Sequence, residues 1–447
     1  MKKHYVIQKD GSICDAGQFL VSGQGSAEFC QFIRLEAEDG PNGDAQPGKP
    51  PYLEVARKFG FNWEANADVG LVSYDYRASL IMALVKEYAR QLVHQIGFPV
   101  YQVSGSNMFD LAHPVVEAYA GLYGDRLYQF KSGSKNVVLS YDASYPQFNL
   151  ASQYSLSYRQ LPFAHFSISD CYRHEQSGEC MLLYRQRRFY MPDLHPYFKS
   201  VEQAFEWYPA IQKQLIEAAR AVNRAYHVSI EVASVRAWEL YLEHLVHIAR
   251  GLGQDILCVV NDDAKDRYWI LNADYKFIDH LGQSREICCI QIDEGNAARL
   301  GIQYVDQDGQ KKVPIIIHSA VPGGIERFVY MMFDDFPRSF PLWLYPVQLR
   351  LLPVNSSHLG LCQRLIEALK PYPIRAEIDD RPESVGKKVR LCHQDLVPFS
   401  AVIGEKEAAL GSLEGILGPQ IAEIMAASQG KPFLPLEIPN LVSLQPK

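Results

Sequence analysis

The sequence predicts an α+β protein with two folded parts: an antiparallel sheet with flanking helices, and a smaller α/β domain at the C-terminus. The chain has 447 residues, of which 47% are hydrophobic, so it is long enough for two or three cores. Strand-like segments dominate its centre and the helical segments are segregated from them, which is typical of an antiparallel sheet. In roughly the last hundred residues strands and helices alternate, which is typical of a mostly parallel sheet.

The first half of the chain shows one long period-3.6 pattern and several short strand patterns. Residues 1–50 predict a short strand or two and a loose loop, because residues 38–51 are rich in Gly, Pro and Asp and cannot bury enough apolar area. The elements expected next are a helix at 74–96, a strand at 98–104, a helix at 113–123 and strands between 127 and 189, among them 136–148.

The second half predicts a long helix, three strands and the alternating C-terminal region. The expected elements are a helix at 200–226, strands at 267–281, 286–293 and 311–321, and a helix at 323–336. The C-terminal elements are strands at 345–355, 374–380 and 398–407, with helices at 356–372, 381–394 and 417–428. A Pro-rich stretch at 336–346 separates the two parts. We therefore expect an N-terminal segment at 1–50, a catalytic domain at 51–340 and a further domain at 341–447.

Charge and cysteine usage limit the partners and the compartment. The formal net charge is −7, so a nucleic acid would need a local basic surface, and we expect no DNA partner. Nine scattered cysteines without a CxxC pair favour a reducing compartment over a disulfide framework. The N-terminus lacks the apolar region of a signal peptide, and no apolar run is long enough to span a bilayer. We expect a cytoplasmic protein without a membrane partner.

The segment from Cys171 to Phe189 concentrates cationic, aromatic and carboxylate side chains. On a strand, Arg173 and Glu175 would face the same side, and so would Arg185, Arg187 and Phe189 on the returning strand. Such a face suits a nucleotide, with guanidinium for phosphate, a ring for the base and a carboxylate for an exocyclic amine or a metal. The alternative is a solvated charged hairpin.

Further residues of the same chemistry follow downstream. Arg327 lies just inside a predicted helix after a Gly-Gly turn, where the backbone can approach a ligand and the side chain can reach a polyphosphate. His195 ends the segment that continues from Phe189, and His318 lies near the end of a predicted strand. They are either satisfied structural residues or members of a shared site.

Several motifs together resemble class II aminoacyl-tRNA synthetases. The stretches YRHEQSGE, YRQRRFYMPDLH and GGIERF look like motifs 2 and 3 of that class. Other stretches, among them FIDHLG, CIQIDEGNAARLGIQYVDQDG and IDDRPESVGKKVR, are similar to archaeal-type threonyl-tRNA synthetases. The resemblance runs from about residue 50 to the C-terminus and implies a class II antiparallel catalytic sheet followed by an α/β anticodon-binding domain.

The resemblance also implies roles for individual residues, with ATP and Mg²⁺ as cofactors and tRNA as the acceptor. Toward ATP, Arg173 would hold the α-phosphate, Arg327 would bind the terminal phosphates, Glu175 would contact adenine and Phe189 would stack on it. Asp193 and Gln291 would contact the amino acid. Arg185 would lie near the substrate or the tRNA end. The implied reaction is in-line attack of a carboxylate on the α-phosphate, which depends on positioning and charge neutralisation.

One departure from the family affects its zinc ion, which a Cys and two His bind. His195 and His318 match the histidines, but Ser144 stands at the cysteine position, and a hydroxyl is a poorer ligand than a thiolate. Either the pocket holds no zinc, or another thiol replaces the missing one. Cys289 is the candidate, because it lies two residues before Gln291 on a predicted strand.

Other departures concern acceptor and assembly. Asn272 stands where the family has a lysine, and Ser106 stands for the motif 1 proline, although 97–110 still predicts a homodimer contact. We expect no N-terminal editing domain, weak discrimination against serine and reduced tRNA contacts. The leading hypothesis is a threonyl-tRNA synthetase-like ligase without editing. The alternatives are a paralogue that activates another amino acid or uses a non-tRNA acceptor, and a non-catalytic regulator that binds ATP or tRNA.

Overall fold

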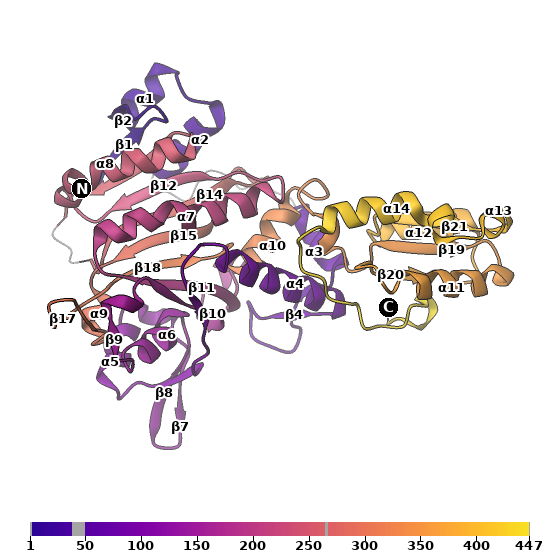
Figure 1. The fold of residues 1–447 in the computed structure, drawn as a ribbon, viewed down its shortest axis with the longest axis horizontal. Coiled ribbons are helices and arrows are strands. Elements are labelled where there is room, and N and C mark those ends of the chain that lie inside the picture. Colours follow the sequence, from indigo (N-terminus) through magenta and orange to yellow (C-terminus); the bar gives the residue numbers. More distant parts are fainter. Residues whose placement is uncertain (1, 38–49, 264–266, 447) are drawn as a thin grey trace. The chain divides into compact units, whose positions relative to one another are not determined.

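Figure 1 shows the fold of the computed structural model, which describes residues 2–37, 50–263 and 267–446. Most of the Gly- and Pro-rich linker predicted at 38–51 lies outside the described residues. The chain forms two compact units: an N-terminal unit of Met1–Tyr52, Trp63–Val72 and Ala89–Asp335, and a C-terminal unit of Leu53–Asn62, Ser73–Tyr88 and Phe336–Lys447.

A ten-stranded sheet organises the N-terminal unit (Figure 1). In spatial order its strands are β2 (Ile13–Asp15), β1 (Lys2–Ile7), β13 (Ile256–Asn261), β12 (His227–Val232), β14 (Trp269–Ile278), β15 (Ser284–Asp293), β18 (Ile315–Ala320), β11 (Arg188–Phe198), β10 (Phe163–Tyr172) and β5 (Val100–Gln102). All neighbours pair antiparallel except β12 with β13 and β10 with β5. The predicted fold class, a large and mainly antiparallel sheet with flanking helices, is confirmed.

Two long helices cover one face of this sheet. Helix α7 (Val201–Arg220) packs against β11, β15 and β18, and α8 (Val235–Leu252) packs against β1, β12 and β13. Tyr275 of β14 belongs to this face, because its hydroxyl accepts a 2.9 Å hydrogen bond from Gln212 of α7. Side chains alternate along a strand, so Asp274 and Lys276 on either side of Tyr275 face away from α7.

The first 37 residues are more ordered than the sequence predicted. After β1 and β2 come two helices, α1 (Ala16–Ser22) and α2 (Ala27–Ala37), in place of the expected loose loop. Helix α2 is amphipathic and buries Phe29, Phe32 and Ile33 in a core shared with β1 and β13. Its last turn carries Glu36 toward β14 and β15.

The segment predicted as one strand at 136–148 is a strand followed by a helix. Strand β8 (Lys135–Leu139) stops, and α6 (Ser144–Ala151) begins after a turn. The carboxylate of Asp142 accepts hydrogen bonds from the backbone N–H groups of Ser144 and Tyr145, at 3.0 and 3.3 Å, and so caps the helix. Ser144 therefore lies at a helix N-terminus. Helix α8 was also not predicted from the sequence.

The other strands and α-helices before residue 336 are short, apart from α4. They are α3 (Tyr52–Lys58), β3 (Phe61–Trp63), β4 (Val72–Tyr74), α4 (Tyr76–Val93), β6 (Met108–Asp110), α5 (Pro114–Ala120), β7 (Gln129–Ser132), β9 (Leu156–Ser157), α9 (Asn296–Arg299), β16 (Tyr304–Val305), β17 (Lys311–Lys312) and α10 (Ile325–Asp334). None of the described helices is long and apolar enough to cross a membrane.

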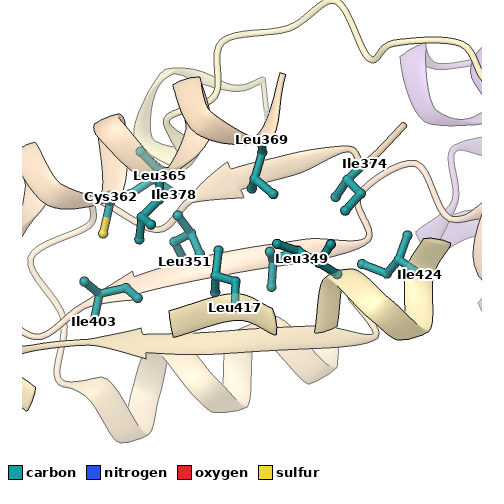
Figure 2. Packing of buried hydrophobic residues seen from close by; sticks show 11 residues of the cluster. Leu349, Leu351, Cys362, Leu365, Leu369, Ile374, Ile378, Ile403, Leu417 and Ile424 are labelled. Atoms are coloured by element: carbon teal, nitrogen blue, oxygen red, sulfur yellow. The ribbon is translucent and has the colours of Figure 1, made fainter. Parts of the chain in front are cut away.

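The C-terminal unit contains a parallel sheet of β20 (Ala376–Ile378), β19 (Leu349–Pro353) and β21 (Phe399–Ile403). Its helices are α11 (Leu359–Leu369), α12 (Val385–Gln394), α13 (Glu405–Leu410) and α14 (Leu413–Ser428). Figure 2 shows Leu349 and Leu351 of β19 packed among side chains from α11 and α14. The predicted α/β character is confirmed, although the strand predicted at 398–407 ends at Ile403, where α13 follows.

Candidate active site

A cavity of about 300 Å³ opens on the sheet face that α7 and α8 leave free. Most of the residues singled out from the sequence line it: Ser144, Arg173, Glu175, Arg185, Phe189, Asp193, Cys289, Gln291, His318 and Arg327. His195 lies immediately behind its wall, in contact with Ser144 and His318. Side chains from distant parts of the chain therefore converge on one space.

Aromatic rings and a backbone carbonyl hold Arg173. The guanidinium carbon lies 5.1 Å from the ring centre of Phe189 and 5.4 Å from that of Tyr123. Its Nε donates a 3.0 Å hydrogen bond to the carbonyl of Tyr141. Among the described residues no carboxylate forms an ion pair with this guanidinium, so its charge is available to an anion in the cavity.

Glu175 is a buried acceptor on the loop after β10. Its Oε2 atom lies 3.7 Å from Arg185 and 3.8 Å from Arg126, and no hydrogen bond satisfies it among the described residues. Burying a carboxylate oxygen without a hydrogen bond is costly, so this atom is suited to accept one from a bound molecule.

The predicted hairpin geometry is wrong in two respects. Strand β10 ends at Tyr172 and β11 begins at Arg188, so Arg173 and Glu175 reach the cavity from a loop. Arg187 does not join the cationic face: it is buried, donates to the carbonyl of Glu175 and pairs with Asp68. An irregular loop does not obey the two-residue alternation on which the prediction depended.

Arg327 lies in the first turn of α10, where the sequence predicted a close backbone approach. A Cβ atom at Gly323, whose φ is +139°, would lie 2.6 Å from the carbonyl oxygen of Ile287, so only glycine fits there. The Arg327 guanidinium donates to the carbonyl of Glu286 at 3.2 Å and pairs with the Glu286 carboxylate at 3.3 Å. The ring of Tyr184 packs against it, with its centre 4.9 Å away.

Acceptor groups lie in another part of the same cavity. Burial raises the pKa of Asp193 to about 7, while the positive charge of His318 opposes that shift. Gln291 lies in register with His318 on one side and Asn272 on the other. The cavity therefore combines arginines with the carboxylate of Asp193 and the amide of Gln291, as a molecule bearing both phosphate and ammonium would require.

His195, His318 and Ser144 form a closed triangle of polar atoms. Nε2 of His195 lies 3.1 Å from Oγ of Ser144 and 3.1 Å from Nδ1 of His318, and the third side measures 3.4 Å. Nε2 of His318 contacts the buried carboxylate of Asp293 at 2.7 Å. Burial alone would lower the pKa of His318, but the hydrogen bond to Asp293 and its charge outweigh burial and raise it. Burial holds the pKa of His195 well below its usual range.

This donor set does not match a thiolate-based zinc site. The third donor is a neutral hydroxyl, and each of the three atoms already has a hydrogen-bond partner within the triangle. In the described part of the chain no three His, Cys, Asp or Glu side chains converge as metal ligands, so Cys289 does not join the two histidines.

Some residues of the cavity were missed from the sequence. Tyr123 ends the predicted helix at 113–123 and Tyr184 begins the stretch YRQRRFYMPDLH, but neither side chain was given a role. Glu286 lies five residues before Gln291, so simple alternation would place it on the opposite face. A register shift between β14 and β15 near Tyr275 and Lys276 turns it toward the cavity.

Comparison with known families and solved structures identifies the class of protein that has this fold. Residues 128–336 match the tRNA synthetase class II core domain (G, H, P, S and T), and residues 348–414 match an anticodon-binding domain. In the solved structures, a threonyl-tRNA synthetase domain from Cryptosporidium parvum superposes with a TM-score of 0.71 at 20% identity, over 81% of this chain and 91% of that one. A prolyl-tRNA synthetase from Giardia lamblia gives a TM-score of 0.62 at 12% identity, over 87% of this chain and 76% of that one. These likenesses define the fold as that of a class II synthetase.

Sequence relatives narrow the assignment. A threonine–tRNA ligase of Pyrobaculum calidifontis is 38% identical over 89% of this chain and 68% of the relative. That of Pyrobaculum arsenaticum is 36% identical over 99% of this chain and 74% of the relative. The chain belongs to the threonine–tRNA ligase family.

Proposed function

We propose that this chain activates threonine with ATP and transfers it to tRNA. The observation that carries the proposal is a single cavity that presents Arg173 and Arg327 together with the acceptors Asp193 and Gln291. A threonyl adenylate carries a phosphate, an aromatic base and an ammonium group, and this cavity offers a partner for each.

The first step is attack of the amino-acid carboxylate on the α-phosphorus of ATP, with pyrophosphate leaving. Arg173 and Arg327 neutralise charge that develops on the phosphate oxygens, and Phe189 offers a stacking surface to adenine. The free oxygen of Glu175 accepts a hydrogen bond from the exocyclic amine, and Arg185 lies beside it. Class II synthetases generally use Mg²⁺, which would supply further neutralisation, and Glu286 is the carboxylate beside Arg327 that could hold it.

In the second step a ribose hydroxyl of tRNA attacks the threonyl carbonyl and AMP leaves. Asp193 and Gln291 keep the ammonium of threonine in place during both steps, so the reacting atoms stay aligned. We propose that the side chain is read by hydrogen bonds from the Ser144, His195 and His318 triangle without a zinc ion, because the triangle lacks an anionic third ligand.

Assembly and compartment are further parts of the proposal. Residues 97–110, which include β5 at the edge of the large sheet, are the proposed homodimer contact. A mass measurement at micromolar concentration tests it, with a monomer as the contrary result. All nine cysteines are unpaired, which supports a reducing, cytoplasmic location.

Charging of tRNA tests the acceptor. Labelled threonine, ATP and purified protein should give acid-precipitable threonyl-tRNA from archaeal or bacterial total tRNA. Exchange of pyrophosphate without any charging would favour the alternative that Ser144 motivates, a paralogue with another amino acid or a non-tRNA acceptor.

A further inference from the structure

A strip of polar side chains leads from Gln291 to the N-terminal helix α2. Asn272, Asp274 and Lys276 occupy alternate positions of β14, on the face that bears the cavity. Asn272 lies in register with Gln291, and Lys276 lies beside Glu36 of α2.

The contacts along the strip are continuous. Gln291 Nε2 lies 3.5 Å from Asn272 Oδ1, at the outer limit of a hydrogen bond. Asn272 Nδ2 donates to Asp274 Oδ1 at 2.8 Å. The other oxygen of Asp274 lies 3.2 Å from the ammonium of Lys276, which contacts Glu36 at 2.7 Å.

The charged end of the strip determines which way the amides point. A carboxylate only accepts hydrogen bonds, so Asn272 must turn its NH₂ group toward Asp274 and its oxygen toward Gln291. That oxygen in turn requires a donor, so Gln291 turns its own NH₂ group toward Asn272. The amide oxygen of Gln291 is then left for the cavity.

We propose that Asp274 is a positioning residue, which acts through Asn272 to present the amide oxygen of Gln291 to the ammonium group of the amino acid. This inference rests on the proposed function, since it takes Gln291 to contact the amino acid. Lys276 and Glu36 support this role: Lys276 favours the ionised form of Asp274, and Glu36 holds Lys276 in place.

Burial shows why the cation is needed. Asp274 is half-buried, and burial together with the nearby Glu286 raises its pKa to about 7, while Lys276 lowers it. Lys276 and Glu36 are themselves mostly shielded from solvent, with side chains 14% and 16% exposed. An ion pair with this shielding loses less to solvent and salt than an exposed one.

The substitution Asp274→Asn reverses the predicted orientation without changing the side-chain size. The introduced amide would offer its single oxygen to Lys276 and its NH₂ group to Asn272. The amides of Asn272 and Gln291 would both flip, and Gln291 would present NH₂ to a positively charged substrate group. We expect the KM for threonine to rise about tenfold or more, as for loss of a hydrogen bond to a charged group, with kcat and the KM for ATP little changed.

Three further variants make the test decisive. Gln291→Leu should raise the KM for threonine by itself. Asp274→Asn should not raise this KM further when it is combined with Gln291→Leu or with Asn272→Leu. Asp170→Asn removes an ion pair with Arg188 on the same sheet, outside the cavity, and should leave the KM for threonine unchanged.

The outcomes distinguish failure of the proposed amino-acid site from failure of the positioning role of Asp274. If Gln291→Leu leaves the KM for threonine unchanged, the proposed amino-acid site is wrong and the positioning role falls with it. If Gln291→Leu raises that KM but Asp274→Asn does not, or if the two effects add, the site stands and the positioning role of Asp274 is refuted.

Discussion

Nε2 of His195 and Nδ1 of His318 lie 3.1 Å apart, inside the wall of the cavity, with the hydroxyl of Ser144 completing the contact. Phe148 packs edge-on against both rings, at 4.8 and 5.4 Å between centres, which fixes their orientation. The two histidines are thus held in one arrangement, and whether they can bind a metal ion depends on the third donor, Ser144.

The zinc content of the protein follows from that third donor. Purified without a histidine tag, the protein should contain well under one zinc per chain, because the side chain that completes the set of two histidines is the neutral hydroxyl of Ser144. Ser144→Cys should gain close to one zinc, since a thiolate would then meet the two histidines, whereas Ser144→Ala should gain none. Elemental analysis measures all three, and one tightly held zinc in the unaltered protein would refute the hydrogen-bonded pocket.

Loss of either Arg173 or Arg327 should nearly abolish adenylate formation. Arg173→Ala and Arg327→Ala each remove a cation aimed at transition-state charge, which typically costs about 3–4 kcal/mol, or a factor of about 10²–10³ in kcat. Arg188→Ala is the control, because this β11 residue pairs with Asp170 outside the cavity. Rates within twofold of the unaltered protein for both cavity variants would contradict the assignment.

The KM for threonine should depend on pH in part through Asp274. Burial raises the pKa of this carboxyl to about 7, so the ionised form that orients Asn272 is lost as the pH falls through that value. The KM for threonine should therefore increase as the pH is lowered from about 8 to about 6. Lys276→Met should move the inflection upward, because Lys276 lowers the pKa of Asp274. The charged and titratable groups around Asp274 are Glu286, Lys276, Glu36, Arg327 and Cys289.

In the same profiles, Asp274→Asn should weaken the pH dependence of the KM for threonine without abolishing it, because burial also raises the pKa of Asp193 to about 7. The KM for ATP should not change with Asp274→Asn. A threonine profile that stays unchanged in Asp274→Asn would assign the titration to another group.

Serine should compete with threonine in the activation step. The two side chains differ by one methyl group, which a pocket discriminates by only about 1–3 kcal/mol, or about 10–200-fold in kcat/KM. Parallel pyrophosphate-exchange measurements with both amino acids give the ratio. Discrimination beyond four orders of magnitude by this chain alone would require a selection mechanism that the pocket does not provide.

The sequence predicted those parts of the fold that follow regular periodicity. Alternation along the strand that is β15 placed Gln291 and Cys289 on one face, and both line the cavity. The Gly-Gly turn before α10 placed Arg327 near a ligand, and it lines the cavity as well. The sequence was misleading where regular periodicity stops. Aromatic and apolar residues around 141–148 read as a strand, although Asp142 and Pro146 are a cap and a first-turn proline.

Local sequence patterns could not predict the contacts between segments that lie far apart in the sequence. Glu36 meets Lys276 across 240 residues of sequence, and a single sequence carries no signal for such a pair. Glu286 faces the cavity only because of a register shift, which depends on the neighbouring strand. The site was thus predictable by residue type and motif, while the strip that positions Gln291 required the structure.

The central claim, that this cavity forms threonyl adenylate, is tested most directly by amino-acid-dependent exchange of labelled pyrophosphate into ATP, measured for each of the twenty amino acids. We predict that threonine supports the highest kcat/KM and that Arg327→Ala removes the exchange. The account would be contradicted if none of the twenty amino acids supported exchange, or if an amino acid other than threonine supported it tenfold better than threonine does.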